Sequence, residues 1–223
     1  HNYRFLKSLL PEGTKTMCMV KAYAYGSGSW EIASILEQEG ATYLTVAYAS
    51  EAITLRQKGI RLPIMVMNAD LDSISELLAY DIEPQVYSLD FLEKYLQKAR
   101  LSAQSSYRIR LKLETGMGRL GLKKTNLTRL VSLISLHPDL EVISVMTHLA
   151  AADEAGADDF SHKQVKRFQQ MYENGHRLVW HFTHCLHPVR THRNRQPHHP
   201  NLPDTGAPSR YLHRLRTRAN HHP

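Results

Sequence analysis

The stretch Met17-Cys-Met-Val-Lys-Ala-Tyr-Ala-Tyr-Gly-Ser-Gly-Ser29 places a lysine, Lys21, at the end of a short apolar run. Such a run is typical of a strand buried on both faces, as in a parallel sheet. A lysine there is partly desolvated, so its amine can lose a proton and attack a carbonyl group. Tyr25, Gly26 and Gly28 then offer a hydroxyl and backbone N–H groups to a phosphate. The combination suggests pyridoxal phosphate on Lys21; the alternative is a solvent-facing lysine in a glycine turn.

Strand and helix patterns alternate through residues 1–173. Strands are expected near residues 16–21, 43–47, 63–67, 84–87, 107–113 and 142–147. Helices are expected near residues 2–10, 30–39, 50–58, 71–80, 89–100, 125–136 and 158–172. Six β–α units in succession predict an α/β fold with a parallel sheet and right-handed crossovers. Two architectures fit, an open doubly wound sheet and a (β/α)8 TIM-type barrel, and six units are two short of the barrel.

A second motif, Tyr107-Arg-Ile-Arg-Leu-Lys-Leu-Glu-Thr-Gly-Met-Gly-Arg-Leu-Gly121, is a strand that runs into a glycine turn. Its charged residues share one face by the two-residue period of a strand: Arg108, Arg110, Lys112 and Glu114. A charged face on a central strand is costly unless the charges are paired or used. In a barrel, this face could point into a polar site at the carboxyl end of the strand.

A third motif, Val145-Met-Thr-His-Leu-Ala-Ala-Ala-Asp-Glu154, places His148 at another strand end. A single histidine there is more often structural. Lys21, Arg119 and His148, however, all follow strands, and the carboxyl ends of barrel strands converge on the active site. The chemistry therefore favours the barrel.

A competing interpretation takes Gly116 to Gly121 as the dinucleotide pattern G-x-G-x-x-G, with Asp139 as the ribose-binding acid. It would make the chain a nicotinamide-dependent oxidoreductase. Three features oppose it: the preceding strand is charged, the motif lies in the fifth unit, and Arg119 projects from a turn that usually admits a pyrophosphate.

The motifs Val20-Lys-Ala-Tyr-Ala-Tyr-Gly-Ser-Gly28, Lys112-Leu-Glu-Thr-Gly-Met-Gly-Arg-Leu-Gly121 and Thr147-His-Leu-Ala-Ala-Ala-Asp-Glu154 resemble, in order and spacing, the N-terminal barrel of alanine racemases. The resemblance covers about residues 1–173 and implies a pyridoxal-phosphate barrel of alanine racemase type, incomplete at about six β–α units. Within that family, the first motif looks most like racemase domains fused behind a muramoyl-peptide ligase.

The resemblance also implies roles by position. Lys21 would form the Schiff base with pyridoxal 5′-phosphate and act as one of two catalytic bases. Tyr25 would bind the cofactor phosphate, Arg119 its phenolic oxygen, and His148 would lie against its ring. Lys112 matches a family lysine that is often carbamylated, which would convert a cation into an anion beside Arg119.

Residues 174–223 have a different composition. They hold eight arginines, no lysine and one acidic residue, Asp204, whereas residues 1–173 hold 20 basic and 20 acidic residues. They also carry ten of the 14 histidines and six of the ten prolines. We predict a disordered tail, and three origins stay open: an arm that binds nucleic acid, a His-rich metal-binding tract, or translation out of frame near Glu173. We favour the last.

Several family features have no match in this tail. They are the Asn-Ser phosphate loop of the next strand, the arginine that faces the pyridine nitrogen, and the C-terminal β-domain, whose tyrosine serves as the second base from the partner subunit of a homodimer. We therefore expect the encoded activity to be interconversion of L- and D-alanine for peptidoglycan synthesis. The 223-residue chain itself is expected to be truncated, inactive and compromised in dimerisation. The alternative function is a non-catalytic pyridoxal-phosphate-binding barrel.

The composition argues against membrane, secreted, disulfide-rich and metal-binding classes of protein. No apolar run approaches the ~18 residues of a membrane span, and the first residues lack the apolar core of a signal peptide. Cys18 and Cys185 give neither a disulfide framework nor metal-ligand spacing. We expect a cytoplasmic protein with a small amino-acid substrate, no resident metal, and neither nucleic acid nor membrane as a partner.

Overall fold

Each apolar strand pattern forms a strand in the computed structural model, which describes residues 1–102, 105–154 and 156–176. The strands are β1 (Met17–Met19), β2 (Tyr43–Val46), β3 (Ile64–Val66), β4 (Glu83–Val86), β5 (Tyr107–Lys112) and β6 (Leu140–Met146). The helices are α1 (Asn2–Ser8), α2 (Lys21–Tyr25), α3 (Ser29–Gln38), α4 (Ala49–Gln57), α5 (Ile74–Ala79), α6 (Leu89–Ala99), η1 (Lys124–Asn126), α7 (Leu127–Ser135) and α8 (Asp158–His176). The predicted alternation of strands and helices is confirmed.

The six strands pair in sequence order, and every pairing is parallel. An open doubly wound sheet would reverse its strand order at a switch point. Sequential pairing of strand–helix units is the arrangement of a (β/α)8 barrel. The topology therefore decides for the TIM-type barrel, of which the described residues supply six strands.

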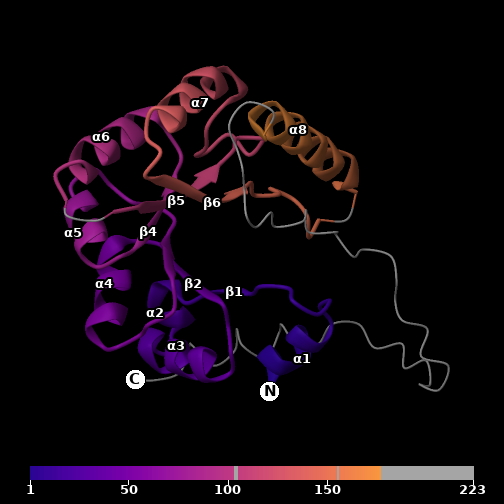
Figure 1. Ribbon diagram of the computed structural model, residues 1–223. Helices are drawn as coiled ribbons and strands as arrows, with labels where there is room; N and C mark the ends of the chain where they lie inside the picture. Colours follow the sequence, from indigo (N-terminus) through magenta and orange to yellow (C-terminus); the bar gives the residue numbers. More distant parts are fainter. Residues whose placement is uncertain (103–104, 155, 177–223) are drawn as a thin grey trace, which may run out of the picture. The chain divides into compact units, whose positions relative to one another are not determined.

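Helices α3 to α8 lie along the outer side of the sheet, and each contacts the next (Figure 1). Helix α6 shows how the sequence directs this packing. The Ser88 hydroxyl accepts the Phe91 N–H at 3.1 Å and begins the helix. The helix then buries one face toward the core: Phe91, Leu92, Tyr95, Leu96 and Ala99. Full burial of one large apolar side chain contributes about 1.5–3 kcal/mol.

The charged face of β5 enters the sheet interior as its pattern predicted. Arg110 is 1% exposed, and its guanidinium lies 2.6 Å from the Glu83 carboxylate of β4. It also donates to the Ser144 hydroxyl of β6 at 3.1 Å and stacks on the Tyr43 ring of β2, 4.4 Å from the ring centroid. Arg108 approaches Glu83 from the other side, at 3.4 Å. The two arginine charges are thus paired with Glu83, and the contacts of Arg110 link β2, β4, β5 and β6.

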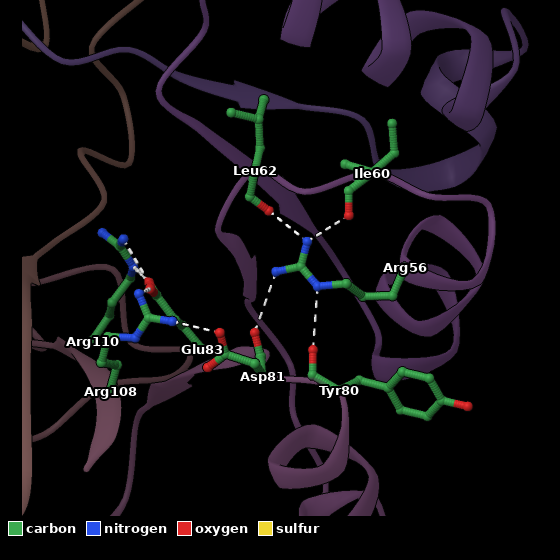
Figure 2. A network of polar contacts seen from close by, with 8 residues as sticks. All are labelled: Arg56, Ile60, Leu62, Tyr80, Asp81, Glu83, Arg108 and Arg110. Carbon is green, nitrogen blue, oxygen red and sulfur yellow. Dashed lines mark hydrogen bonds and ion pairs between the residues drawn. The ribbon is translucent and has the colours of Figure 1, made fainter. Parts of the chain in front are cut away.

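A third arginine, Arg56, fixes the amino-terminal ends of β3 and β4. The Arg56 guanidinium of α4 donates to two carbonyl groups before β3, those of Ile60 and Leu62, each at 2.7 Å. It also donates to two carbonyl groups before β4, those of Tyr80 at 3.2 Å and Asp81 at 3.3 Å (Figure 2). The planar fork of donors lets one side chain hold two loops at once.

The element boundaries differ from the sequence predictions in two instructive places. Strand β1 ends at Met19, two residues before the predicted end, because the chain turns into a left-handed segment after Lys21. Helix α5 begins at Ile74 because the Asp70 carboxylate accepts the Ser73 N–H at 2.8 Å and forms a turn first. The predicted boundary after residue 173 lies near the end of the described residues, and the predicted tail lies outside them from residue 177 onward.

Candidate active site

Lys21 directly follows Val20, a buried residue that is hydrogen-bonded to the neighbouring strand β2. Val20 is fully buried and donates its N–H to the Thr45 carbonyl of β2 at 2.9 Å. Lys21 itself is half-buried and begins α2 at the carboxyl end of β1. The sequence therefore places its amine at the edge of the sheet where barrel active sites form.

The segment after Lys21 is a left-handed turn. Ala22, Tyr23, Ala24 and Tyr25 have φ angles of 51°, 56°, 49° and 56°. Left-handed backbone costs a non-glycine residue roughly 1–2 kcal/mol, so four in succession need support from their surroundings. Strain of this kind is concentrated at functional sites.

This turn corrects one expectation about the glycines. The N–H groups of Gly26 and Gly28 both donate to the Tyr23 carbonyl, at 3.1 and 2.9 Å, so they stabilise the turn itself. The sequence had suggested that these N–H groups bind a phosphate, but in the structure they are already bonded and are not free to do so. Tyr25 is 68% exposed, and its hydroxyl donates to the Met19 sulfur at 3.1 Å. Of the three predicted phosphate donors, the Tyr25 hydroxyl is therefore the one that the turn does not use, and it lies on an exposed side chain beyond the carboxyl end of β1.

Lys112 and Arg119 lie close enough at the end of β5 for the charge of one to affect the other. Lys112 is the last residue of the strand and is half-buried. Burial lowers the pKa of its amine, and the charge of Arg119 lowers it further, while Glu114 partly opposes the shift. A larger fraction of Lys112 is therefore uncharged at a given pH than for an exposed lysine.

The loop that carries Arg119 is organised by the Glu114 carboxylate. It accepts the N–H groups of Gly116 at 2.5 Å and Gly118 at 3.0 Å. Burial raises the pKa of Glu114, but hydrogen bonds from the backbone N–H groups of residues 116–119 outweigh it and lower the pKa overall. Glu114 thus acts as an ionised centre around which the loop folds.

His148 follows β6 and joins the same cluster. Partial burial lowers its pKa, and so do the positive charges of Lys112, Arg119 and Lys21, in that order. The three cations are therefore near enough to His148 to affect its pKa, and all four residues follow or end the strands β1, β5 and β6. The structure brings together the four residues that three separate motifs had singled out.

A residue that the motifs did not reveal holds two of these loops. Gln164 of α8 is fully buried; its amide donates to the His148 carbonyl at 3.0 Å and to the Thr115 hydroxyl at 3.3 Å, and accepts the Ala150 N–H at 2.9 Å. Arg167, one helical turn on, donates to the Thr115 carbonyl at 3.2 Å. A polar residue on the inner face of a predicted helix was the only signal in the sequence.

The glycines of the second motif have a packing role. Gly121 has a φ of 145°, and a Cβ atom there would lie 2.8 Å from the Glu114 nitrogen. The loop folds back so that Leu122 pairs with Leu113, and a short 3₁₀ turn follows in place of a helix opened by the motif. The dinucleotide interpretation requires that helix, and the structure therefore does not support it.

Two negative findings apply to residues 1–102, 105–154 and 156–176. No helix among them is long and apolar enough to cross a membrane. No group of three or more histidine, cysteine or acidic residues among them is arranged to bind a metal ion. The His-rich tract lies outside this part of the chain.

The fold and the site define a parallel β/α-barrel domain with a cluster of cations at the carboxyl ends of its strands. A family model described as the alanine racemase N-terminal domain matches residues 1–187. The chain therefore belongs to the alanine racemase family.

Individual alanine racemases are similar to this chain in sequence and in structure. The chain is 40% identical to an alanine racemase of Geobacillus kaustophilus and 41% identical to that of Geobacillus stearothermophilus, over 174 residues in each case. Each match covers 77% of this chain and 44% of the relative. An alanine racemase structure from Clostridium difficile 630 superposes with a TM-score of 0.77 at 29% identity, covering 82% of this chain and 51% of that one.

The chain thus spans less than half the length of the curated relatives that it matches. The barrel predicted from the three motifs is confirmed as an alanine racemase N-terminal domain. The fusion behind a ligase stays a prediction.

Proposed function

We propose that this chain is the cofactor-binding barrel of an alanine racemase, which interconverts L- and D-alanine with pyridoxal phosphate for peptidoglycan synthesis. The observation that carries the proposal is the convergence of Lys21, Lys112, Arg119 and His148 at the strand ends of a barrel of this family. A homodimer in the complete protein and a cytoplasmic setting belong to the same proposal.

The residues present fit such a cofactor. Its phosphate and phenolic oxygen are anionic, and the site gathers three cationic side chains. The nearby carboxylate of Glu114 is already engaged by backbone N–H groups. Lys21 would hold the cofactor covalently, Tyr25 would donate to the phosphate, and Arg119 would face the phenolic oxygen. Partial burial and the cationic neighbours lower the pKa of His148, which favours its neutral form, so the ring of His148 would lie against the cofactor ring without adding a further positive charge.

Pyridoxal phosphate, when bound, supplies a ring system that accepts the electrons left when alanine loses its α-proton. The chain's own part is to move that proton. The Nζ atom of Lys21 would take it from one face of alanine and return it there in the reverse direction. Racemisation needs a second base on the opposite face, and the family supplies it from the C-terminal domain of the partner subunit.

Lys112 and Arg119 are two cations at the end of β5 that would repel each other, and a carbamylated Lys112 would remove this repulsion. Its lowered pKa favours the uncharged amine, the form that can add carbon dioxide. Addition of carbon dioxide at the uncharged Nζ atom forms an N–C bond, breaks one C=O π bond and releases one proton from the nitrogen, so a neutral amine becomes a carbamate anion. That anion would pair with Arg119 and orient it. This pairing also separates a racemase from a barrel that only carries the cofactor.

Since the chain spans less than half of its relatives, we propose that the 223-residue polypeptide binds the cofactor without turning over alanine. The test is to incubate the full chain with pyridoxal phosphate, reduce it with borohydride, and map the modified lysine by mass spectrometry. We expect modification at Lys21, loss of visible absorbance on reduction, and no racemisation of alanine.

Two variants serve as controls. Lys21→Ala should abolish the adduct, whereas Lys94→Ala, which removes an exposed lysine of α6, should leave it unchanged. Adduct formation spread evenly over the lysines would contradict the assignment of Lys21. Sustained racemisation by the purified chain would contradict the proposal that it is inactive alone.

A further inference from the structure

The two peptide groups that flank Lys21 are both held by side chains from outside the α2 turn. The carbonyl of Val20, which precedes Lys21, accepts the Ser29 hydroxyl of α3 at 2.8 Å. The N–H of Ala22, which follows Lys21, donates to the Glu51 carboxylate of α4 at 2.7 Å. With both neighbouring peptide groups fixed, the direction in which the Lys21 side chain leaves the backbone is fixed too.

Glu51 carries the longer-range of these two contacts. Its Oε1 atom accepts the Ala22 N–H, and its Oε2 atom accepts the N–H groups of Ala47 at 2.8 Å and Tyr48 at 3.1 Å. Ala47 and Tyr48 connect the end of β2 to the start of α4. One carboxylate therefore ties the turn after β1 to the turn after β2.

The position of Glu51 suits it to this task. It lies in the first turn of α4, where the positive end of the helix dipole favours an ionised carboxylate. Three N–H donors and the helix end compensate its charge, so it does not act as a free base or counter-ion for Lys21. It is a tether whose strength depends on staying ionised.

The turn that it holds is the one that most needs support. Ala22 is the first of four non-glycine residues in the left-handed region, and it is exposed to solvent. The Ala22 N–H is therefore protected by its bond to Glu51 and not by burial. Exchange of this one amide with solvent becomes a direct report on the tether.

We propose that Glu51 is a positioning residue that fixes the left-handed turn carrying Lys21 and so presents the Lys21 amine at the strand end. The consequence for cofactor binding rests on the function proposed above. The tether itself does not, because it is visible in the chain without cofactor.

The experiment measures hydrogen exchange of the full 223-residue chain, resolved at the Ala22 amide, in the wild type and in Glu51→Gln. Loss of a charge-assisted hydrogen bond should speed exchange at Ala22 roughly 10- to 100-fold. The same samples are then labelled with pyridoxal phosphate and borohydride. Labelling of Lys21 should slow by about 10-fold, and that of exposed Lys94 should not change.

Glu76→Gln is the matched control, since Glu76 is an exposed acidic residue in the first turn of the neighbouring helix α5. It should leave both readouts at the wild-type values. Glu51→Asp is the second variant, because it keeps a negative charge at the start of α4 while shortening the reach to Ala22. It should fold even where Glu51→Gln does not, and it should still speed exchange at Ala22.

The outcomes separate the two proposals. Unchanged exchange at Ala22 in the folded Glu51 variants overturns the tether, and unchanged labelling of Lys21 beside faster exchange overturns the role of Glu51 in positioning the Lys21 amine. If wild-type chain shows no preference for Lys21, the proposed function fails, and the exchange measurement alone still decides whether Glu51 holds the turn.

Discussion

The Arg110 guanidinium and the Glu83 carboxylate form a buried ion pair, 2.6 Å apart, between neighbouring strands in the sheet interior. Both side chains are at most 2% exposed. Removing one partner would leave an uncompensated charge away from water, which costs far more than the pair contributes.

We therefore predict that Arg110→Met lowers the free energy of unfolding by about 3–5 kcal/mol. Glu83→Gln should have a similar effect, and the double variant should lose clearly less than the sum of the two. Urea denaturation of the four proteins measures this. Additive losses would mean that the two side chains do not depend on each other in the folded state.

The Gly121 backbone gives a second prediction. A methyl group there meets the Glu114 nitrogen at 2.8 Å and forces a φ of 145° on alanine. Gly121→Ala should therefore destabilise the fold by at least about 2 kcal/mol and displace the loop that carries Arg119. Thermal unfolding checks the first effect, and slower labelling of Lys21 by pyridoxal phosphate checks the second.

Gly118→Ala is a suitable comparison, because a Cβ atom at Gly118 meets nothing within 4 Å while its φ is also positive, at 72°. It tests the backbone strain without the clash. Equal losses at Gly118 and Gly121 would show that the close approach to the backbone of Leu113 and Glu114 has no effect of its own.

The site also predicts a pH dependence. The pKa of His148 lies below the ordinary value of about 6.5 because of partial burial and three nearby cations. The unfolded chain therefore takes up a proton at His148 before the folded chain does. The contribution of His148 to stability is full above the unfolded pKa and is lost as pH falls toward the folded pKa.

Arg119→Gln removes one of those cations and should raise the pKa of His148. It should also raise the pKa of Lys112, since Arg119 lowers both. Titration of the His148 ring signals by NMR measures the first shift. Arg129→Gln, which removes an exposed arginine of α7, is the control and should leave the titration of His148 unchanged. Equal titration curves in the two variants would mean that Arg119 does not face His148.

The sequence predicted the barrel well because its information was local. Buried parallel strands are apolar runs, and strand ends with polar residues mark the active-site edge, so Lys21, Lys112 and His148 could be placed by pattern alone. Glu51 and Gln164 could not. Glu51 bonds to a residue 29 positions away in the sequence, and Gln164 bonds to residues 14 to 49 positions away. The sequence around each of them looks like an ordinary helix.

The left-handed turn was missed for a related reason. Alanine and tyrosine carry no signal for positive φ, which normally indicates glycine or asparagine. The contacts made by Ser29 and Glu51, together with the glycine N–H groups inside the turn, show why the backbone stays there. For the same reason the glycine N–H groups, assigned to a phosphate from the sequence, are used inside the turn.

The last prediction concerns the coding sequence beyond Glu173. Residues 174–223 contain His, Arg and Pro without lysine, the composition that C-rich codons give in a wrong frame. The family match, by contrast, covers residues up to 187 at most and less than half of each curated relative. We predict that re-sequencing the DNA from codon 165 to beyond codon 223 and translating all three frames finds a second frame that continues the barrel. That frame should encode an Asn-Ser phosphate loop, an arginine-bearing strand and a β-domain with its tyrosine. If the recorded frame stands and no other frame reads sensibly, residues 174–223 are genuine, and cofactor binding through Lys21 is the most that this chain retains.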